Sequence, residues 1–418
     1  MAQVVSRLQR RHPRIEGWVL DERGSVREHV AVFVNGDRVP GDAVVGPSDR
    51  VEILGAISGG EDGAELLVGT RKGLFRLRGP RGGAMDIADR RFSGQTVEFA
   101  IRDRRTGTYY ASITHGQFGP RVFFTDDPAS TDWEQAQGPA FPEGFEATVK
   151  RIWTIQPGEE DGVLWAGVDP AAMFRSEDGG RSWELNRGLW DVPGRADWNP
   201  GAGGLCLHSI CTWPGDPGRL AVGISAAGVW VTEDGGDTWE RGFSGLVPRY
   251  VPEEARGGAT DLCVHNMHRC PGRPDRLYLQ FHGGVYRSDD AGGSWIDIGS
   301  DGGLPSDFGF PLAIDPHDPD RAFVLPLEGD FDRVTPEGKV RVFETRDAGE
   351  TWLPLEDGLP AGDAYLTVLR QAMAQDGGDP LGLYFGAESG EVFGSADGGA
   401  SWTVTAEHLP PVLSVRPG

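Results

Sequence analysis

The residues best suited to chemistry stand in two copies of the pattern Leu-Cys-x-His, at Leu205–His208 and Leu262–His265. Each copy lies in an apolar stretch that we predict to be a strand, where residues two apart point to the same side. If the two strands are neighbours, Cys206, His208, Cys263 and His265 form a Cys₂His₂ set of the kind that binds zinc. A cysteine in such a strand is more often a small buried apolar residue. We therefore expect no metal or other cofactor, with zinc as the alternative.

An eight-residue pattern, [Ser/Thr]-x-Asp-x-Gly-x-x-Trp, recurs along the chain and indicates an architecture built from repeats. Its copies are Ser176–Trp183, Thr232–Trp239, Ser288–Trp295, Thr345–Trp352 and Ser395–Trp402. A looser copy, Thr125–Trp133, lacks the glycine and carries one extra residue. Successive tryptophans are 50, 56, 56, 57 and 50 residues apart. A unit of about 50 residues with four short strands is typical of a β-propeller blade.

Each repeat has the same predicted order of strands and turns. An apolar inner strand comes first, then a Pro/Gly/Asp turn, two more strands, the Asp-containing turn and a strand that bears the Trp. Counting the second and third strands gives seven units between residues 65 and 395. The first unit lacks an inner strand, whereas Leu409–Val415 looks like an inner strand with nothing after it. We therefore predict a mainly β fold, a seven-bladed propeller over 61–418 that the C-terminal strand closes, which removes an open sheet edge.

The repeated pattern resembles the Asp box, or BNR repeat, of the propellers found in sialidases, sortilin-type receptors and photosystem-assembly factors. The resemblance covers 61–418 and implies a fold rather than an activity. It implies that each Asp caps the turn between a blade's third and fourth strands, and that each Trp packs between blades. We expect these structural roles for Asp178, Asp234, Asp290, Asp347 and Asp397. Sialidases have six blades and an Arg-Ile-Pro-type motif near their start, and this chain departs from both features.

Sites in propellers usually lie where the inner strands begin, around the central channel. Aligning the repeats on their Asp-Pro-x-Arg turns places His208, His265 and Phe310 at one level, and a looser alignment adds Glu98, Arg151 and Arg370 or Gln371. The predicted ligand-binding residues at this channel mouth are Trp153, Trp198, His208, His265, Asp307, Phe310 and Tyr365. The catalytic candidates for a hydrolase are Glu98, Arg151, His208, His265 and Arg370. The alternative is a water-filled channel whose polar residues satisfy one another.

Residues 1–60 differ from the repeats. Residues 2–11 have apolar residues at helical spacing, Val30–Val34 and Arg50–Leu54 read as strands, and Asn35-Gly36 is a turn signal. The segment ends in DRVEILGAISGG and resembles the later part of a MoaD/ThiS-type sulfur carrier, a ubiquitin-like α+β (β-grasp) protein. In that family the terminal Gly-Gly, here Gly59 and Gly60, is adenylated and converted to a thiocarboxylate.

Two departures from the sulfur carriers bear on this resemblance. The family begins with a β-hairpin and this sequence begins at the helix, so we expect the strand at 51–54 to have an open edge. Either the true start lies upstream of Met1 or the domain is a remnant. Gly60 is followed by Glu61, and a carboxylate inside a peptide bond cannot be activated. Carrier activity therefore requires cleavage after Gly60. The alternative is a degenerate β-grasp segment that serves as a linker or docking module.

Composition narrows the choice of partners and compartment. The net charge is −23, and residues 1–60 hold eight Arg and eight acidic residues, so the excess lies in the repeats. Such acidity argues against nucleic acid and anionic membranes as partners. No apolar run approaches the roughly 18 residues of a membrane helix, and no signal peptide is evident. Four Cys without a CxxC pattern favour a reducing compartment, so we expect a cytoplasmic protein.

Together these features predict a non-catalytic binding or scaffold propeller whose channel face takes a protein or a small molecule. Its N-terminal segment suggests a link to thiocarboxylate chemistry, with a sulfur-activating enzyme or a processing protease as partner. One alternative is a glycosidase of sialidase-like type that acts at the channel mouth. The other is a sulfur-carrier precursor that is cleaved after Gly60.

Overall fold

The computed structural model describes residues 30–34, 37–39, 46, 51–55, 63–198, 200–201, 203–256, 262–299 and 301–418. The chain divides into two compact units, Met1–Gly63 and Ala64–Gly418, which are treated separately below. Within the described ranges, no helix is both long and apolar enough to cross a membrane.

The first unit contains a three-stranded antiparallel sheet. Its strands are β1 (Val30–Val34), β2 (Asp37–Val39) and β3 (Val51–Gly55), in the order β2-β1-β3. The two strands predicted here are confirmed, and β3 lies at an edge of the described sheet, as expected. The predicted helix over residues 2–11, the Asn35-Gly36 turn and the Gly59-Gly60 pair lie outside the described residues.

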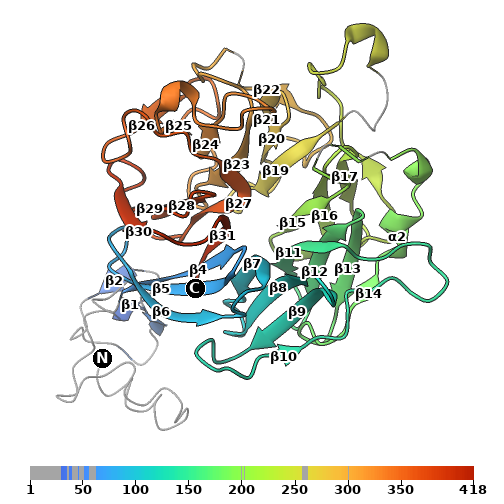
Figure 1. Cartoon of the computed structure of the whole chain (residues 1–418), viewed down its shortest axis with the longest axis horizontal. Coiled ribbons are helices and arrows are strands. Elements are labelled where there is room, and N and C mark those ends of the chain that lie inside the picture. The colour runs from blue at the N-terminus through green and yellow to red at the C-terminus, as the bar shows by residue number, and fades with distance from the viewer. Residues whose placement is uncertain are drawn as a thin grey trace. The chain divides into compact units, whose positions relative to one another are not determined.

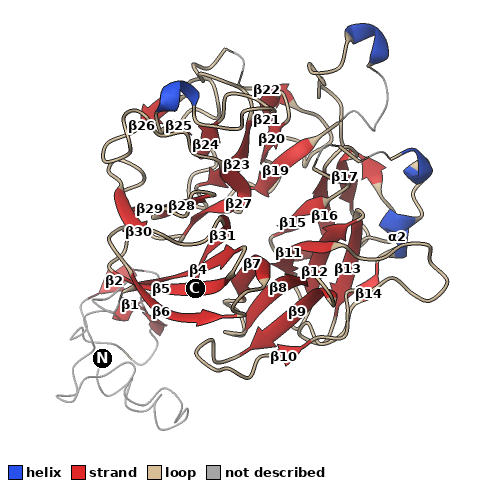
Figure 2. Cartoon of the chain, in the orientation of Figure 1, coloured by secondary structure: helices blue, strands red, loops and turns tan. Residues whose placement is uncertain are grey.

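The second unit is mainly β and consists of antiparallel sheets arranged around a common centre (Figures 1 and 2). Five sheets have four strands each, taken in chain order. The first holds β7 (Thr96–Arg102), β8 (Tyr109–His115), β9 (Gly119–Thr125) and β10 (Glu134–Gln135). The second holds β11 (Arg151–Pro157), β12 (Leu164–Asp169), β13 (Ala172–Ser176) and β14 (Glu184–Leu185). The third holds β15 (Leu207–Trp213), β16 (Asp216–Ile224), β17 (Gly228–Thr232) and β18 (Glu240–Arg241).

The last two of these sheets follow the same order. One holds β19 (Val264–Arg269), β20 (Leu277–Phe281), β21 (Gly284–Ser288) and β22 (Ile296–Asp297). The other holds β23 (Gly309–Ile314), β24 (Ala322–Pro326), β25 (Val342–Thr345) and β26 (Leu353–Leu355). The loops contain a short helix, α2 (Arg187–Trp190), and 3-10 turns at Arg195–Asp197, Glu253–Ala255 and Pro336–Gly338.

The remaining strands form an eight-stranded sheet in the order β30-β29-β28-β27-β31-β4-β5-β6. Its strands are β4 (Ala64–Thr70), β5 (Gly73–Gly79), β6 (Asp86–Arg91), β27 (Val368–Gln375), β28 (Leu383–Ala387), β29 (Val392–Ser395), β30 (Thr403–Ala406) and β31 (Val412–Pro417). A single parallel pair, Gln371 with Ser414, joins two antiparallel runs of four strands. The C-terminal strand β31 pairs with β4, which confirms the predicted use of that strand.

The core lies between neighbouring sheets. The second strands β20 and β28 are buried along their whole length, because sheets cover both of their faces. One apolar cluster, for example, joins Trp165 of one sheet to Leu207 and Trp230 of the next. In Figure 1 the strands nearest the centre are β7, β11, β15, β19 and β23 of the four-stranded sheets and β27 and β31 of the eight-stranded sheet.

The five repeated turns have one hydrogen-bond pattern. In the first, Asp178 Oδ1 accepts bonds from the Ser176 hydroxyl at 2.8 Å and from the Ser182 amide at 2.9 Å. The Ser182 hydroxyl donates to the second carboxylate oxygen at 2.6 Å. The same three bonds recur at Asp234, Asp290, Asp347 and Asp397. The expected turn-capping role of these aspartates is therefore confirmed.

Candidate functional site

A β-bulge near the start of each inner strand turns one side chain toward the centre. The pairing between first and second strands shifts register after Val97, Ile152, Leu207, Val264 and Gly309. A bulge leaves an extra residue outside the ladder and re-aims its side chain. The residues at these shifts are Glu98, Trp153, His208 and His265, with Phe310 and Pro311 together in β23. The closing strand β31 has a corresponding shift at Leu413. The structure thus puts Trp153, rather than Arg151, at the bulge of its strand. In β27 a longer shift, between Val368 and Met373, contains Arg370 and Gln371.

Three guanidinium groups alternate with two aromatic rings at this level. The guanidinium carbon of Arg370 lies 5.2 Å from the Trp153 ring and 5.0 Å from the Phe310 ring. Arg151 lies over Trp153 at 4.7 Å, and Arg333 lies over Phe310 at 5.5 Å. Each contact is within the range of cation–π attraction. We call these five residues the central stack.

Arg370 is the buried cation of the central stack. Its Nε donates to the His265 carbonyl at 3.1 Å. No carboxylate of the described residues forms an ion pair with its guanidinium. The nearby thiols of Cys206 and Cys263 do not act as counter-ions, because burial raises their pKa and favours the neutral form. Burial lowers the pKa of Arg370 from its usual value. A buried cation without a counter-ion is costly, so this position is suited to an external anion.

A layer of polar side chains beside the central stack satisfies its own hydrogen bonds. Asn266 Nδ2 donates to the Arg370 carbonyl at 2.8 Å, and Gln371 Nε2 donates to the His208 carbonyl at 2.9 Å. Arg416 Nη1 donates to the Gln371 carbonyl at 2.8 Å. These polar groups thus bond to one another, as in the alternative to a ligand-binding mouth given above.

His208 belongs to the same self-satisfied layer. Its Nδ1 lies 3.0 Å from the Ser209 hydroxyl and its Nε2 lies 2.9 Å from the Val264 carbonyl. Burial, reinforced by the charge of Arg370, lowers the pKa of His208 well below its usual value. Both ring nitrogens are occupied in a neutral ring, so the geometry favours a structural role over catalysis or metal binding.

The thiol and imidazole groups that converge here are Cys263, His265 and His282. Their candidate ligand atoms all lie within 4.8 Å of one another, and they form the one such group within the described residues. The structure thus brings together two of the four residues of the alternative Cys₂His₂ set, Cys263 and His265. Cys206 directs its thiol to the Gly203 carbonyl at 3.3 Å, and His208 is occupied as described above. The third member, His282, was not among the predicted residues, because it comes from the β20–β21 hairpin rather than from an inner strand.

Two carboxylates flank Arg151 at the edge of the central stack. Glu98 is buried and forms an ion pair with Arg151, with 3.2 Å between Glu98 Oε1 and Arg151 Nε. Asp169 is the register partner of Arg151 across the β11–β12 ladder. Burial raises the pKa of Asp169, although Lys150 and Arg151 oppose this shift.

Three predicted residues lie elsewhere or at the margin. Trp198 is 6% exposed and packs on Trp230, with ring centroids 5.4 Å apart, so it belongs to the core and not to the mouth. Tyr365 is 64% exposed and lies against Gly338 in the loop after β24. Asp307 remains close to the site, because its charge acts on His282 and its carboxylate lies 3.6 Å from Arg249.

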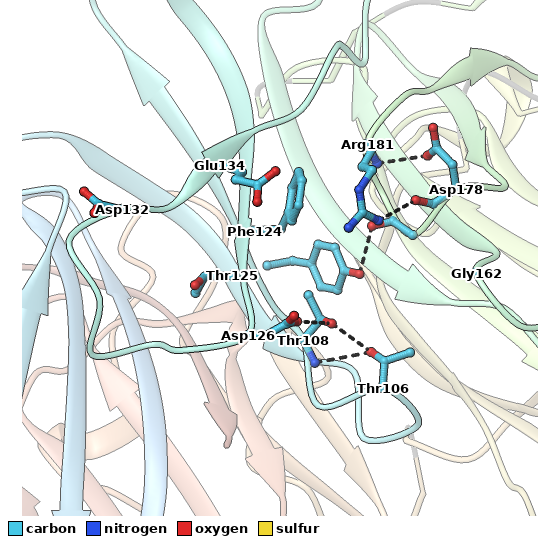
Figure 3. Close-up of a pocket in the computed structure, with 12 residues that line it drawn as sticks. Thr106, Thr108, Phe124, Thr125, Asp126, Asp132, Glu134, Gly162, Asp178 and Arg181 are labelled. Atoms are coloured by element: carbon cyan, nitrogen blue, oxygen red, sulfur yellow. Dashed lines mark hydrogen bonds between the residues drawn. The ribbon is translucent and has the colours of Figure 1, made fainter.

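A separate cavity of about 340 Å³ lies at the repeated turn between two sheets (Figure 3). Its lining includes Tyr110, Asp126, Glu134 and Arg181. Tyr110 donates its hydroxyl to the Gly179 carbonyl at 3.0 Å, and Arg181 Nη1 donates to the Asp178 carbonyl at 2.9 Å. These bonds hold the turn itself, so we assign this cavity a structural origin.

Comparison with known proteins bears on the N-terminal segment and on the larger unit separately. Residues 1–60 match the sequence model of the ThiS family. The oligoxyloglucan-reducing end-specific xyloglucanase of Emericella nidulans is 23% identical over 232 residues, which cover 47% of this chain and 26% of that enzyme. The chain thus spans about a quarter of that relative.

Solved structures show the fold of the larger unit. The GH74 xyloglucanase from Xanthomonas campestris has a TM-score of 0.54 at 18% identity, over 82% of this chain and 52% of that one. A putative 6-phosphogluconolactonase from Bacteroides uniformis has a TM-score of 0.52 at 12% identity, over 85% of this chain and 100% of that one. At such identities the likeness is one of fold. The larger unit is a β-propeller.

Proposed function

We propose that this protein is a cytoplasmic binding protein whose propeller takes an anionic group at the central stack. The five separate sheets and the two halves of the eight-stranded sheet count as seven blades of the Asp-box type. The anion is the carboxylate, thiocarboxylate or phosphate of a small molecule or of a partner protein. The N-terminal segment links this binding to sulfur-carrier chemistry.

The observation that carries the proposal is the unpaired guanidinium of Arg370 between Trp153 and Phe310. The chain has 63 acidic residues, yet none of those described pairs with this buried cation. Arg151 and Arg333 lie over the same two rings, at 4.7 Å and 5.5 Å, and add to the positive potential. Aromatic rings also fix the planes of the guanidinium groups, which orders them before a ligand arrives.

Titration calorimetry with sulfate, thiosulfate, phosphate and a peptide ending in Gly-Gly, with a free or an amidated C-terminus, tests the proposal. Arg370→Met should weaken anion binding by roughly 30-fold or more, since removing one partner of a buried charge pair costs about 2 kcal/mol or more. Arg346→Met is the matched control, because Arg346 is exposed and pairs with Glu344 elsewhere. Equal binding by wild type and Arg370→Met, or no binding of any probe by wild type, would refute the proposal.

The sulfur link rests on the ThiS match, which ends at Gly60. Two residues without side chains suit entry into the narrow cleft of a sulfur-activating enzyme. A carrier role further requires a protease that cuts after Gly60. Intact-mass measurement on protein from its native host tests this: a released fragment heavier by the difference between sulfur and oxygen supports a carrier. A single full-length mass under sulfur-demanding growth leaves the segment as a docking module.

Hydrolysis is the second candidate, and the observation that favours it is the pair of acids beside Arg151. Asp169 has a raised pKa, as a general acid needs, while Glu98 is ion-paired with Arg151. Two carboxyl groups in different environments are the minimum for glycoside cleavage. Chromogenic glycosides, including a sialoside, test this candidate. Activity that Asp169→Asn and Glu98→Gln each reduce by at least about a hundredfold would support it. Activity that survives both changes would reject it.

A further inference from the structure

The β19–β20 ladder brings Cys263 and His282 face to face. The His282 amide donates to the Cys263 carbonyl at 3.0 Å, directly after the pairing of Val264 with Phe281. The bulge after Val264 then re-aims His265 out of the regular alternation. Pairing of two antiparallel strands thus positions all three residues. No loop has to move to bring them together.

The proton on His265 can be assigned from its partner. Its Nδ1 lies 2.7 Å from the Gly309 carbonyl, and a carbonyl can only accept a hydrogen bond. Nδ1 therefore carries the proton, and in the neutral ring Nε2 presents a lone pair. That lone pair faces His282 Nδ1 at 3.3 Å. A backbone carbonyl that holds the far nitrogen of a histidine is the usual outer-shell arrangement of a metal ligand.

His282 has a similar outer shell. Its Nε2 lies 3.9 Å from a carboxylate oxygen of Asp330. In the metal-free ring Nδ1 donates to His265 Nε2 at 3.3 Å, and a metal ion at Nδ1 would move that proton to Nε2, beside the Asp330 carboxylate. The rings of Tyr250 and Phe308 lie 4.3 Å and 5.2 Å from the His282 ring and restrict its rotation. The Tyr250 hydroxyl also accepts the Cys263 amide at 2.9 Å.

We propose that Cys263 Sγ, His265 Nε2 and His282 Nδ1 form a site for a divalent transition-metal ion of the zinc type. One thiolate and two imidazoles match the donors that zinc prefers, and three protein ligands leave a fourth position for an external ligand. On binding, the Cys263 S–H bond breaks, a metal–sulfur bond forms and one proton passes to water, with no change of oxidation state. This inference stands on the three ligands and does not depend on anion binding at Arg370.

Metal titration of the full chain, purified with chelator, tests the site. Co²⁺ serves as the spectroscopic probe, because a thiolate ligand produces a charge-transfer band and tetrahedral coordination produces intense visible bands. We expect one Co²⁺ per chain, displaced by one Zn²⁺. Cys263→Ser should abolish the charge-transfer band, and His282→Gln should weaken Co²⁺ binding by at least about tenfold.

Matched controls separate this site from the other candidates. Cys211→Ser removes a buried thiol that bonds the Met267 carbonyl, and it should leave the spectrum unchanged. Cys206→Ser tests the set expected from the sequence, and a band lost in that variant but kept in Cys263→Ser would overturn the proposal. So would wild-type protein that binds no Co²⁺ or Zn²⁺. Arg370→Met should keep the metal while it loses the anion, so failure of one proposal is distinguishable from failure of the other.

Discussion

Replacing Arg416 by Met should open the seam where the two ends of the propeller meet. One parallel pair, Gln371 with Ser414, connects β27 to β31, so side chains must supply the rest of the cohesion. Arg416 Nη1 donates to the carbonyls of Gln371 at 2.8 Å, Val415 at 2.7 Å and Met373 at 3.3 Å. Its Nη2 also contacts the Gln371 side-chain oxygen, and its guanidinium lies 4.8 Å from the Phe99 ring.

The magnitude follows from what Met leaves behind. Four oxygens lose their donor, and each lost hydrogen bond is worth about 1 kcal/mol net. Burial lowers the pKa of Arg416 to about 10, which shows that the charge itself is poorly solvated. Removing that charge recovers part of the loss. We expect the free energy of unfolding to fall by about 2–3 kcal/mol.

Urea unfolding gives the free energy, and hydrogen exchange of peptides from β27 and β31 locates the change. Exchange should accelerate in both strands and not in β20, which is remote from the seam. Arg346→Met is the control, because Arg346 is exposed and its partner Glu344 keeps a second ion pair, with Arg321 at 2.6 Å. A loss below about 0.5 kcal/mol with unaltered exchange in β31 would show that backbone pairing alone closes the ring.

Three further predictions concern the repeated turns and the closing strand. The Thr238 hydroxyl and amide, with the Thr232 hydroxyl, lower the pKa of Asp234 to about 2. A lowered carboxyl pKa gives stability that is complete above about pH 4 and is lost toward pH 2, which acid unfolding monitored by circular dichroism can measure. Asp234→Ala should lower the urea midpoint more than Asp127→Ala does, because Asp127 in the loose copy accepts one bond, from the Ala129 amide; equal midpoints would contradict this. Val415→Ala should lower the free energy of unfolding, measured by calorimetry, by about 2 kcal/mol, because Val415 is fully buried. Leu413→Ala should lower it less, because Leu413 is only partly buried.

Local patterns in the sequence predicted the strands and turns of this protein. The Asp turn closes through bonds within seven residues, from Ser176 to Ser182, so any chain with this pattern can form it. A serine or threonine directly before each Trp, which supplies the last of these bonds, was visible in every full copy. The pairing of β31 with β4 could be predicted, because the first blade lacked an inner strand and the C-terminal strand lacked a partner. Pairing the two removes an open sheet edge.

The site was predicted in part. Alignment of the repeats put His208, His265 and Phe310 at one level, and the structure has a β-bulge at each of these positions. Trp198, which we expected at the channel mouth, packs on Trp230 in the core, because a long loop can fold its aromatic residues inward. Sequence spacing contains no information on which of these a loop does.

The sequence by itself determined the repeat, the strands and the capped turns, because those structures are made from contacts between residues close in the chain. The tertiary structure alone decided which groups meet at the centre. Arg370 lies between Trp153 and Phe310 because three sheets converge there. The spacing of these residues in the sequence does not predict that they are close in space. In the same way, strand pairing places His282 beside Cys263. Both ring nitrogens of His208 form hydrogen bonds with neighbouring residues instead.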